Sequence, residues 1–169
     1  EIVKKLISDA DILINNFRPG VMDKIGLGFN DCKKINSNLI YASINGFGDA
    51  GPYSNAPAYD HVVQAMAGAT NIQADNDEPA YIKTLLCDKI TAYTVCQSLS
   101  SALFKRERTG DADRLNLSMI DSAVFFLWPD GMMNHTLLDD DVVTLPPLTK
   151  SYNLYKCKDG FLSIAALSD

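Results

Sequence analysis

The chain has 169 residues, of which 47% are hydrophobic and 21% are charged, and its formal net charge is −6 at pH 7. This balance is typical of a globular chain long enough to bury a core, and it excludes a mostly disordered protein. No basic stripe is present that would displace counterions from phosphates, so we expect no nucleic-acid partner. No apolar stretch approaches the length needed to cross a bilayer, so no membrane partner is expected either.

The cysteines and histidines do not predict a metal site. Four cysteines are scattered along the chain without the paired spacing of a zinc site or a disulfide framework. The two histidines, His61 and His135, each lack a second histidine three or four residues away. We therefore expect reduced thiols, a cytoplasmic location and no bound metal.

The first quarter of the chain predicts helices that lead into buried strands. Residues 1–7 carry apolar side chains at helical spacing, and residues 10–14 form a short apolar run of strand length. A second buried strand is predicted at residues 39–44. This alternation indicates an α/β fold with a parallel sheet.

The rest of the chain continues the pattern. A short helix is predicted at residues 59–67, and the longest helix from about Lys89 to Arg108, with Gly110 as its stop. Residues 114–118 alternate as a strand does. Toward the end, two short strands at 152–155 and 161–165 predict a hairpin.

Asp88 stands out on physical grounds alone. It follows the apolar residues 85–87 and opens the longest predicted helix. An aspartate there is expected to cap free backbone N–H groups and to benefit from the helix dipole. Two interpretations follow: a cap that only stabilises the helix, or a partly buried carboxylate that these donors keep ionised and aimed at a ligand.

A series of short motifs then follows in a particular order. The series comprises NFRPGVMDKIGLG at 16–28, NSNLIYASINGFG at 36–48, GPY at 51–53, AYD at 58–60, QAMAG at 64–68, KRERTG at 105–110 and LSMIDSA at 117–123. In this order the motifs resemble those of the family III CoA-transferases, the CaiB/BaiF family. The resemblance covers nearly the whole chain.

The resemblance implies the domain organisation. Residues 1–144 would form part of a Rossmann-like, CoA-binding α/β large domain, and residues 145–169 a linker and the start of a smaller domain. Family members are more than twice this length, and their two subunits are threaded through each other like chain links. We therefore expect a central portion of a longer protein that forms an interlocked homodimer.

The resemblance also implies an activity, the transfer of CoA from an acyl-CoA donor to a carboxylic acid acceptor. Coenzyme A is then a substrate, and no cofactor is permanently bound. Asp88 matches the family's nucleophile, whose carboxylate attacks the thioester carbonyl to give a mixed anhydride and then an aspartyl-CoA thioester. The residues implied in CoA binding are Asn16, Phe17, Arg18, Lys24, Pro57, Ala58, Tyr59 and Asp60.

Two other functions stay open. α-Methylacyl-CoA racemases share the fold and most motifs, but they pair the aspartate with a histidine for proton transfer. This chain has Tyr59 where the racemase motif has that histidine, and a phenol with a pKa of about 10 is poorly matched to proton exchange near neutral pH. His61 follows two residues later, and a helix over 59–67 would point it in another direction. The third reading is a CoA-binding protein without turnover, which an intact Asp88 disfavours.

Overall fold

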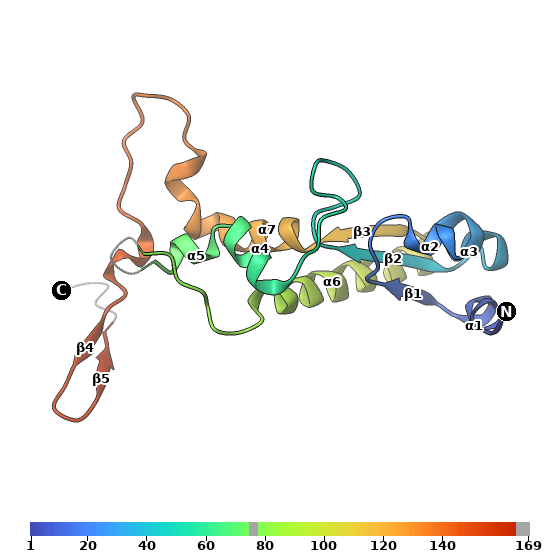
Figure 1. Cartoon of the computed structure of the whole chain (residues 1–169), viewed down its shortest axis with the longest axis horizontal. Helices are drawn as coiled ribbons and strands as arrows, with labels where there is room; N and C mark the ends of the chain where they lie inside the picture. The colour runs from blue at the N-terminus through green and yellow to red at the C-terminus, as the bar shows by residue number, and fades with distance from the viewer. Residues whose placement is uncertain (75–77, 165–169) are drawn as a thin grey trace. The chain divides into compact units, whose positions relative to one another are not determined.

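The computed structural model describes residues 1–74 and 78–164. The chain divides into two compact units, Glu1–Phe126 and a second that begins at Leu127. The first unit holds a three-stranded parallel sheet and the helices that pack on it (Figure 1). The predicted α/β class with a parallel sheet is therefore confirmed.

The sheet has the strand order β1-β2-β3, with β2 in the middle. Ala42 of β2 lies opposite Ile14 on one side and Leu115 on the other, and both pairings are parallel. All three strands were predicted, with bounds shifted by two residues or fewer. The strands are β1 (Ile12–Asn15), β2 (Ile40–Asn45) and β3 (Arg114–Ser118).

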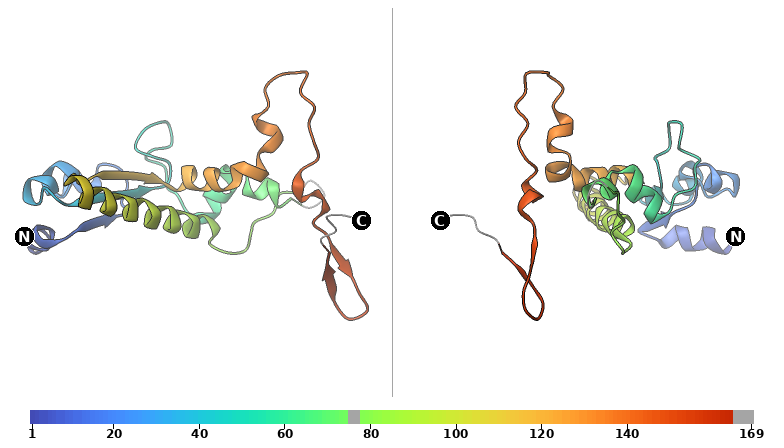
Figure 2. Two further views of the ribbon diagram at one scale, coloured as in Figure 1. Left: turned by 180° about the vertical axis from the view of Figure 1, so that it is seen from behind. Right: turned by 60° about the vertical axis from the view of Figure 1, so that its left-hand side comes forward.

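Helices cover both faces of the sheet, with α6 on one face and α1 and α3 on the other. The longest helix, α6, begins three residues earlier than predicted, and it ends where Gly110 adopts a left-handed conformation with φ of 78°. In Figures 1 and 2 it runs along the strands. The helices are α1 (Ile2–Asp9), α2 (Val21–Lys24), α3 (Phe29–Ile35), α4 (Asp60–Met66), α5 (Ala69–Ile72), α6 (Leu86–Thr109) and α7 (Met119–Gly131). No helix within residues 1–74 and 78–164 has both the length and the apolar character that a membrane crossing requires.

The core of the first unit lies on the two faces of β2. Successive side chains of a strand point to opposite faces, so the apolar run at residues 39–42 can fill both. One cluster packs against α6 and the other against α1 and α3. The clusters are Ile40, Ala42, Val95, Leu99 and Ala102 on the α6 side, and Ile7, Cys32, Leu39 and Tyr41 on the other.

The second unit contains two short 3₁₀ helices and a two-stranded antiparallel hairpin. Leu154 lies opposite Ser163, and the N–H of Cys157 donates to the carbonyl of Gly160 over 2.8 Å to close the turn. The predicted hairpin is therefore confirmed, although Ala165 lies outside the described residues. The elements are η1 (Met133–Thr136), η2 (Leu148–Ser151), β4 (Leu154–Lys156) and β5 (Phe161–Ser163).

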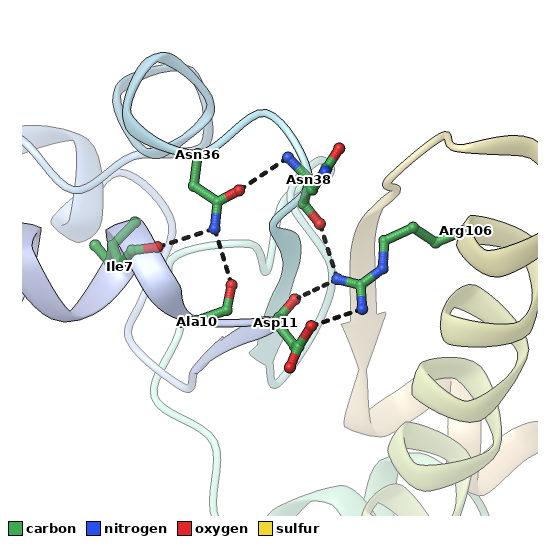
Figure 3. A network of polar contacts seen from close by, with 6 residues as sticks. All are labelled: Ile7, Ala10, Asp11, Asn36, Asn38 and Arg106. Atoms are coloured by element: carbon green, nitrogen blue, oxygen red, sulfur yellow. Dashed lines mark hydrogen bonds and ion pairs between the residues drawn. The ribbon is translucent and has the colours of Figure 1, made fainter.

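Arg106, near the end of α6, ties this helix to the amino ends of β1 and β2 (Figure 3). Its guanidinium donates to the backbone carbonyls of Asp11 and Asn38, at 3.2 and 3.0 Å, and to the Asp11 carboxylate at 2.7 Å. Asn36 extends the network by donating to the carbonyls of Ile7 and Ala10 at the end of α1. Three segments that are distant in sequence are thus joined by one side chain of fixed fork geometry.

We expect Arg106→Ala to lower the free energy of unfolding of the full-length protein by about 1.5–3 kcal/mol, because a charged donor is removed from two carbonyls. The neighbouring Lys105 is the matched control. It also forms an ion pair, at 2.6 Å with Asp113, but that pair is solvent-exposed and should contribute less. Urea titration of both variants measures the difference. Equal losses in Arg106→Ala and Lys105→Ala would contradict a special role for the Arg106 network.

Candidate functional site

A cavity of about 690 Å³ opens at the carboxyl ends of the three parallel strands. Residues 16–19 follow β1, residues 44–46 end β2, and Met119 follows β3, and all of them line it. The loop at 54–60 and one side of α6 complete the wall. The carboxyl edge of a parallel sheet is the place where α/β proteins bind their ligands, because the loops that follow the strands converge there.

The cavity brings together most of the residues singled out in the sequence. Segments from the start, the middle and the long helix of the chain meet in it. Lys24, the last residue of α2, is not among the lining residues. The predicted residues that line it are Asn16, Phe17, Arg18, Pro57, Ala58, Tyr59, Asp60 and Asp88.

Gly46 allows the loop after β2 to fold back over the strand end. A Cβ atom at Gly46 would lie 2.2 Å from the Cβ of Ala58, which is far inside the contact distance of two carbon atoms. The Gly46 carbonyl also accepts the N–H of Ile120, at 3.1 Å, and so holds the start of α7 nearby. The missing side chain therefore lets Ala58, and with it Tyr59, approach the end of β2.

Asp88 is the third residue of α6, and its exposed side chain lines the cavity. The expectation that it caps the helix is wrong. The residue before α6 is Leu85, which has no side-chain cap. The carboxylate that reaches the first turn belongs to Asp60, whose Oδ2 accepts the backbone N–H of Asp88 at 3.0 Å. Because Asp88 already lies inside the helix, its own carboxylate is left free to face the cavity.

Asp60 and Gln64 form a buried polar pair beneath Asp88. They lie one turn apart on α4, with 6% and 2% of their surfaces exposed. Gln64 Nε2 donates to Asp60 Oδ1 at 2.6 Å and also lies within hydrogen-bond distance of the carbonyls of Ile82 and Thr84. Its Oε1 accepts the N–H of Ile82 at 3.1 Å. The pair thereby connects α4, the segment before α6 and the first turn of α6.

The pKa of Asp88 lies above the ordinary value for an aspartate. Partial removal from water is the larger cause, and the negative charge of Asp60 is the second. Helix N–H donors, which would favour the ionised form of Asp88, are not among the causes of this shift. Burial, with further effects from Asp60 and Asp88, raises the pKa of the Cys87 thiol to about 11. That thiol therefore stays protonated at neutral pH.

Tyr59 and His61 lie close together, but only Tyr59 lines the cavity. The Tyr59 backbone is extended, because the residue precedes α4 rather than starting it. The two rings are parallel, with centroids 6.2 Å apart. The expected divergence of the two side chains, which assumed a helix from residue 59, is therefore wrong, although His61 does stay outside the cavity wall.

The comparison with known proteins agrees with this geometry. Residues 1–169 match the sequence profile of CoA-transferase family III. The chain belongs to that family. It is 41% identical to an acetyl-CoA:oxalate CoA-transferase of Acetobacter aceti over 128 residues, and this match covers 75% of this chain and 33% of that protein. It is also 38% identical to a formyl-CoA:oxalate CoA-transferase of Escherichia coli over 125 residues, and this match covers 73% of this chain and 30% of that protein.

A solved structure of the same family has the same fold. A CaiB/BaiF family protein from Brucella suis matches with a TM-score of 0.84 and 31% sequence identity. The match covers 97% of this chain and 44% of that one. The family III chain thus spans about a third of the length of the curated relatives and less than half of the solved relative.

The family III site also contains residues that were not singled out in the sequence. Thr91, Ala92, Val95 and Cys96 line the cavity along α6. They follow Asp88 by three, four, seven and eight positions, which is the spacing of one helical face, so helical periodicity counted from Asp88 could have found them. The buried role of Gln64 had only a weak signal, its position one turn after Asp60.

The cavity wall of the family III chain offers Arg18 as a cationic group that can pair with phosphate oxygens. Within residues 1–74 and 78–164, no cluster of three or more His, Cys, Asp or Glu side chains is placed to hold a metal ion. The wall carries the carboxylates of Asp60 and Asp88, the guanidinium of Arg18, the phenol of Tyr59 and the thiol of Cys96, together with hydroxyl, amide and backbone groups.

The raised pKa of Asp88 predicts a pH-dependent stability difference in the full-length protein. A group whose folded pKa exceeds its unfolded value stabilises the fold below the unfolded pKa, about 3.9, and loses that contribution as pH rises through the folded pKa. Asp88→Asn does not titrate. The melting temperature of this variant minus that of the wild type should therefore increase from about pH 4 to about pH 7.

The control for this measurement is Asp31→Asn, because Asp31 is likewise the third residue of its helix, α3, but lies outside the cavity. It corrects for the removal of one negative charge. The melting-temperature difference of Asp88→Asn from wild type, minus the same difference for Asp31→Asn, should therefore rise with pH. If it stays flat or decreases, the raised pKa of Asp88 is contradicted.

Proposed function

We propose that the protein is a CoA-transferase that moves CoA from an acyl-CoA donor to a carboxylic acid, with Asp88 as the nucleophile. One observation carries the proposal: Asp88 faces the same cavity as the segment after β1 and the loop at 57–60. Membership of CoA-transferase family III supports it. Two relatives are named for transfer to oxalate, so we propose a small dicarboxylate, with oxalate first, as the acceptor.

The proposed reaction conserves the thioester through two anhydrides. An Asp88 oxygen attacks the donor thioester carbon, the C–S bond breaks, and a mixed anhydride and CoA thiolate form. The thiolate attacks the Asp88 carbonyl carbon, which releases the donor acid and leaves an aspartyl-CoA thioester. The acceptor carboxylate attacks that thioester, and the released thiolate then takes the acceptor acyl group and frees Asp88. A carboxylate suits both roles because it can attack and can also leave.

The surroundings of Asp88 support this role. Partial desolvation raises its pKa, and a more basic carboxylate is a better nucleophile once it is ionised. We assign to Arg18 an ionic contact with the CoA phosphates, and to Asn16, Phe17 and the 57–60 loop the contacts that orient the thioester. Lys24 lies outside the cavity wall, and we propose that it meets a more distant part of CoA.

We further propose the arrangement of the full-length protein. Coenzyme A enters as a substrate rather than as a bound cofactor. The protein forms an interlocked homodimer in the cytoplasm. Residues 1–144 belong to the large α/β domain, and residues 145–169 lead into a smaller one.

We expect Asp88→Asn to reduce kcat for CoA transfer by on the order of 10³-fold or more, because a neutral amide cannot form the anhydride. Hydroxylamine added during turnover should label Asp88 in the wild type and not in the variant. The matched control is Asp31→Asn, the equivalent helix position outside the cavity, which should keep normal turnover. Near-normal transfer by Asp88→Asn would overturn the assignment, and CoA binding without any transfer by the wild type would favour a non-catalytic protein.

We also expect transfer rather than racemisation, because Tyr59 stands where the racemase motif has histidine and His61 does not line the cavity. The full-length protein should be incubated with a 2-methylacyl-CoA and a free dicarboxylate in deuterated water. The expected result is CoA exchange to the acid with no rapid deuteration of the α-carbon. Rapid α-deuteration without CoA exchange would replace the transferase proposal with a racemase.

A further inference from the structure

The carboxamide of Gln64 has only one orientation that satisfies its neighbours. The N–H of Ile82 faces its Oε1 at 3.1 Å, whereas the carbonyls of Ile82 and Thr84 face its Nε2 at 3.2 and 3.1 Å. Rotation of the amide by 180° would set oxygen against two carbonyls and nitrogen against an N–H. Since Gln64 is buried, water cannot relieve such a mismatch. The segment at 82–84 therefore determines which end of Gln64 faces Asp60.

This orientation in turn determines the group required at position 60. Gln64 Nε2 donates to Asp60 Oδ1 at 2.6 Å, and the backbone N–H of Asp88 donates to Asp60 Oδ2 at 3.0 Å. Both oxygens meet donors, so an amide at this position would turn its own N–H against one of them. A carboxylate, which only accepts, fits. The chain of contacts runs from the 82–84 segment through Gln64 and Asp60 to the backbone of Asp88.

We propose that Gln64 is a positioning residue for Asp88: it orients the Asp60 carboxylate, and Asp60 holds the turn of α6 from which Asp88 faces the cavity. The inference rests on the proposed function of Asp88. Gln64 does not line the cavity, so contact with substrate does not account for its polar side chain. Its effect on the reaction passes through Asp60 and the Asp88 backbone. A shift of the nucleophile by about 1 Å is enough to slow a reaction by up to about 100-fold.

A merely structural Gln64 would behave differently from a positioning one. A structural residue holds α4 against the 82–84 segment, and its loss lowers stability in the way that any buried residue of α4 does. The neighbouring Val63 provides that comparison, because it is fully buried on α4 and does not line the cavity. Val63→Ala removes packing and leaves the Gln64–Asp60–Asp88 contacts in place.

The test uses Gln64→Met in the full-length protein, because methionine keeps the length and most of the volume of glutamine without its hydrogen bonds. We expect kcat for CoA transfer to fall by about tenfold or more, with KM for the acyl-CoA changed much less. Val63→Ala should lose at least as much thermal stability and keep its kcat. An unchanged kcat in Gln64→Met, or an equal loss in Val63→Ala, would overturn the proposal.

The pH profile of kcat/KM is a second readout. Asp60 from α4 is the charge that acts on the Asp88 carboxylate. Cys87 precedes Asp88 on α6, and the other charged or titratable groups of the cavity wall are Arg18, Tyr59 and Cys96. Partial desolvation is the larger cause of the raised pKa of Asp88 and the charge of Asp60 is the second, and an Asp60 carboxylate that turns away from Asp88 opposes its ionisation less. The acidic limb of the profile should therefore move to lower pH in Gln64→Met and stay in place in Val63→Ala. A limb that stays in place in both variants would overturn the proposal.

Amide hydrogen exchange separates this inference from the proposed function. The Asp88 N–H should exchange faster in Gln64→Met than in wild type, whether or not the protein transfers CoA. If the wild type shows no transfer but exchange at Asp88 still rises, the positioning contact stands and the proposed function fails. Unchanged exchange at Asp88 together with normal transfer would refute the positioning role alone. Should Gln64→Met not fold, Gln64→Asn, which keeps the amide on a side chain shorter by one carbon, is judged by the same outcomes.

Discussion

The carboxylate of Asp60 is the contact on which the candidate site depends. One oxygen accepts from the first turn of α6, and the other accepts from Gln64 on its own helix. A buried anion is tolerable only when donors replace the water it has lost, and here a backbone N–H and a side-chain amide do so. The same negative charge adds to partial desolvation, the larger cause, in raising the pKa of the neighbouring Asp88.

The parallel sheet supplies the second constraint. All three strands end at one edge, so the segments that follow them converge although they are separated by about 30 and 70 residues of chain. Asn16 follows β1, Gly46 follows β2 and Met119 follows β3, and each lines the cavity. Gly46 adds a local condition, because any side chain there would collide with Ala58 and displace the loop that carries Tyr59 and Asp60.

Some of the motifs shared with CoA-transferase family III lie at this edge, whereas the motif at 36–48 runs through the core strand β2 and the motif at 105–110 lies at the amino ends of the strands. The NFR segment lies in the loop after β1, and the AYD segment runs from the cavity loop into α4. The core positions on β2 need only be apolar and of suitable size, so many sequences satisfy them. The loops must present particular groups in particular places, which is why short motifs there are informative about function.

The sequence by itself determined the fold class, the three strands, the long helix with its stop at Gly110, and the family. Hydrophobic periodicity and glycine conformation are local properties, and they are readable along the chain. Eight of the residues that line the cavity were also predicted, because the resemblance in motif order implied that Asn16, Tyr59 and Asp88 belong to one site.

Only the tertiary structure decided how Asp88 is held. From the sequence, Asp88 was taken for the cap of its own helix, whereas the first turn is bonded by Asp60, 28 positions earlier. The orientation of Gln64 likewise depends on carbonyls at Ile82 and Thr84, 18 and 20 positions later. Contacts between side chains and distant backbone groups leave no periodic trace in a sequence, because they depend on where the folded chain brings each carbonyl and N–H.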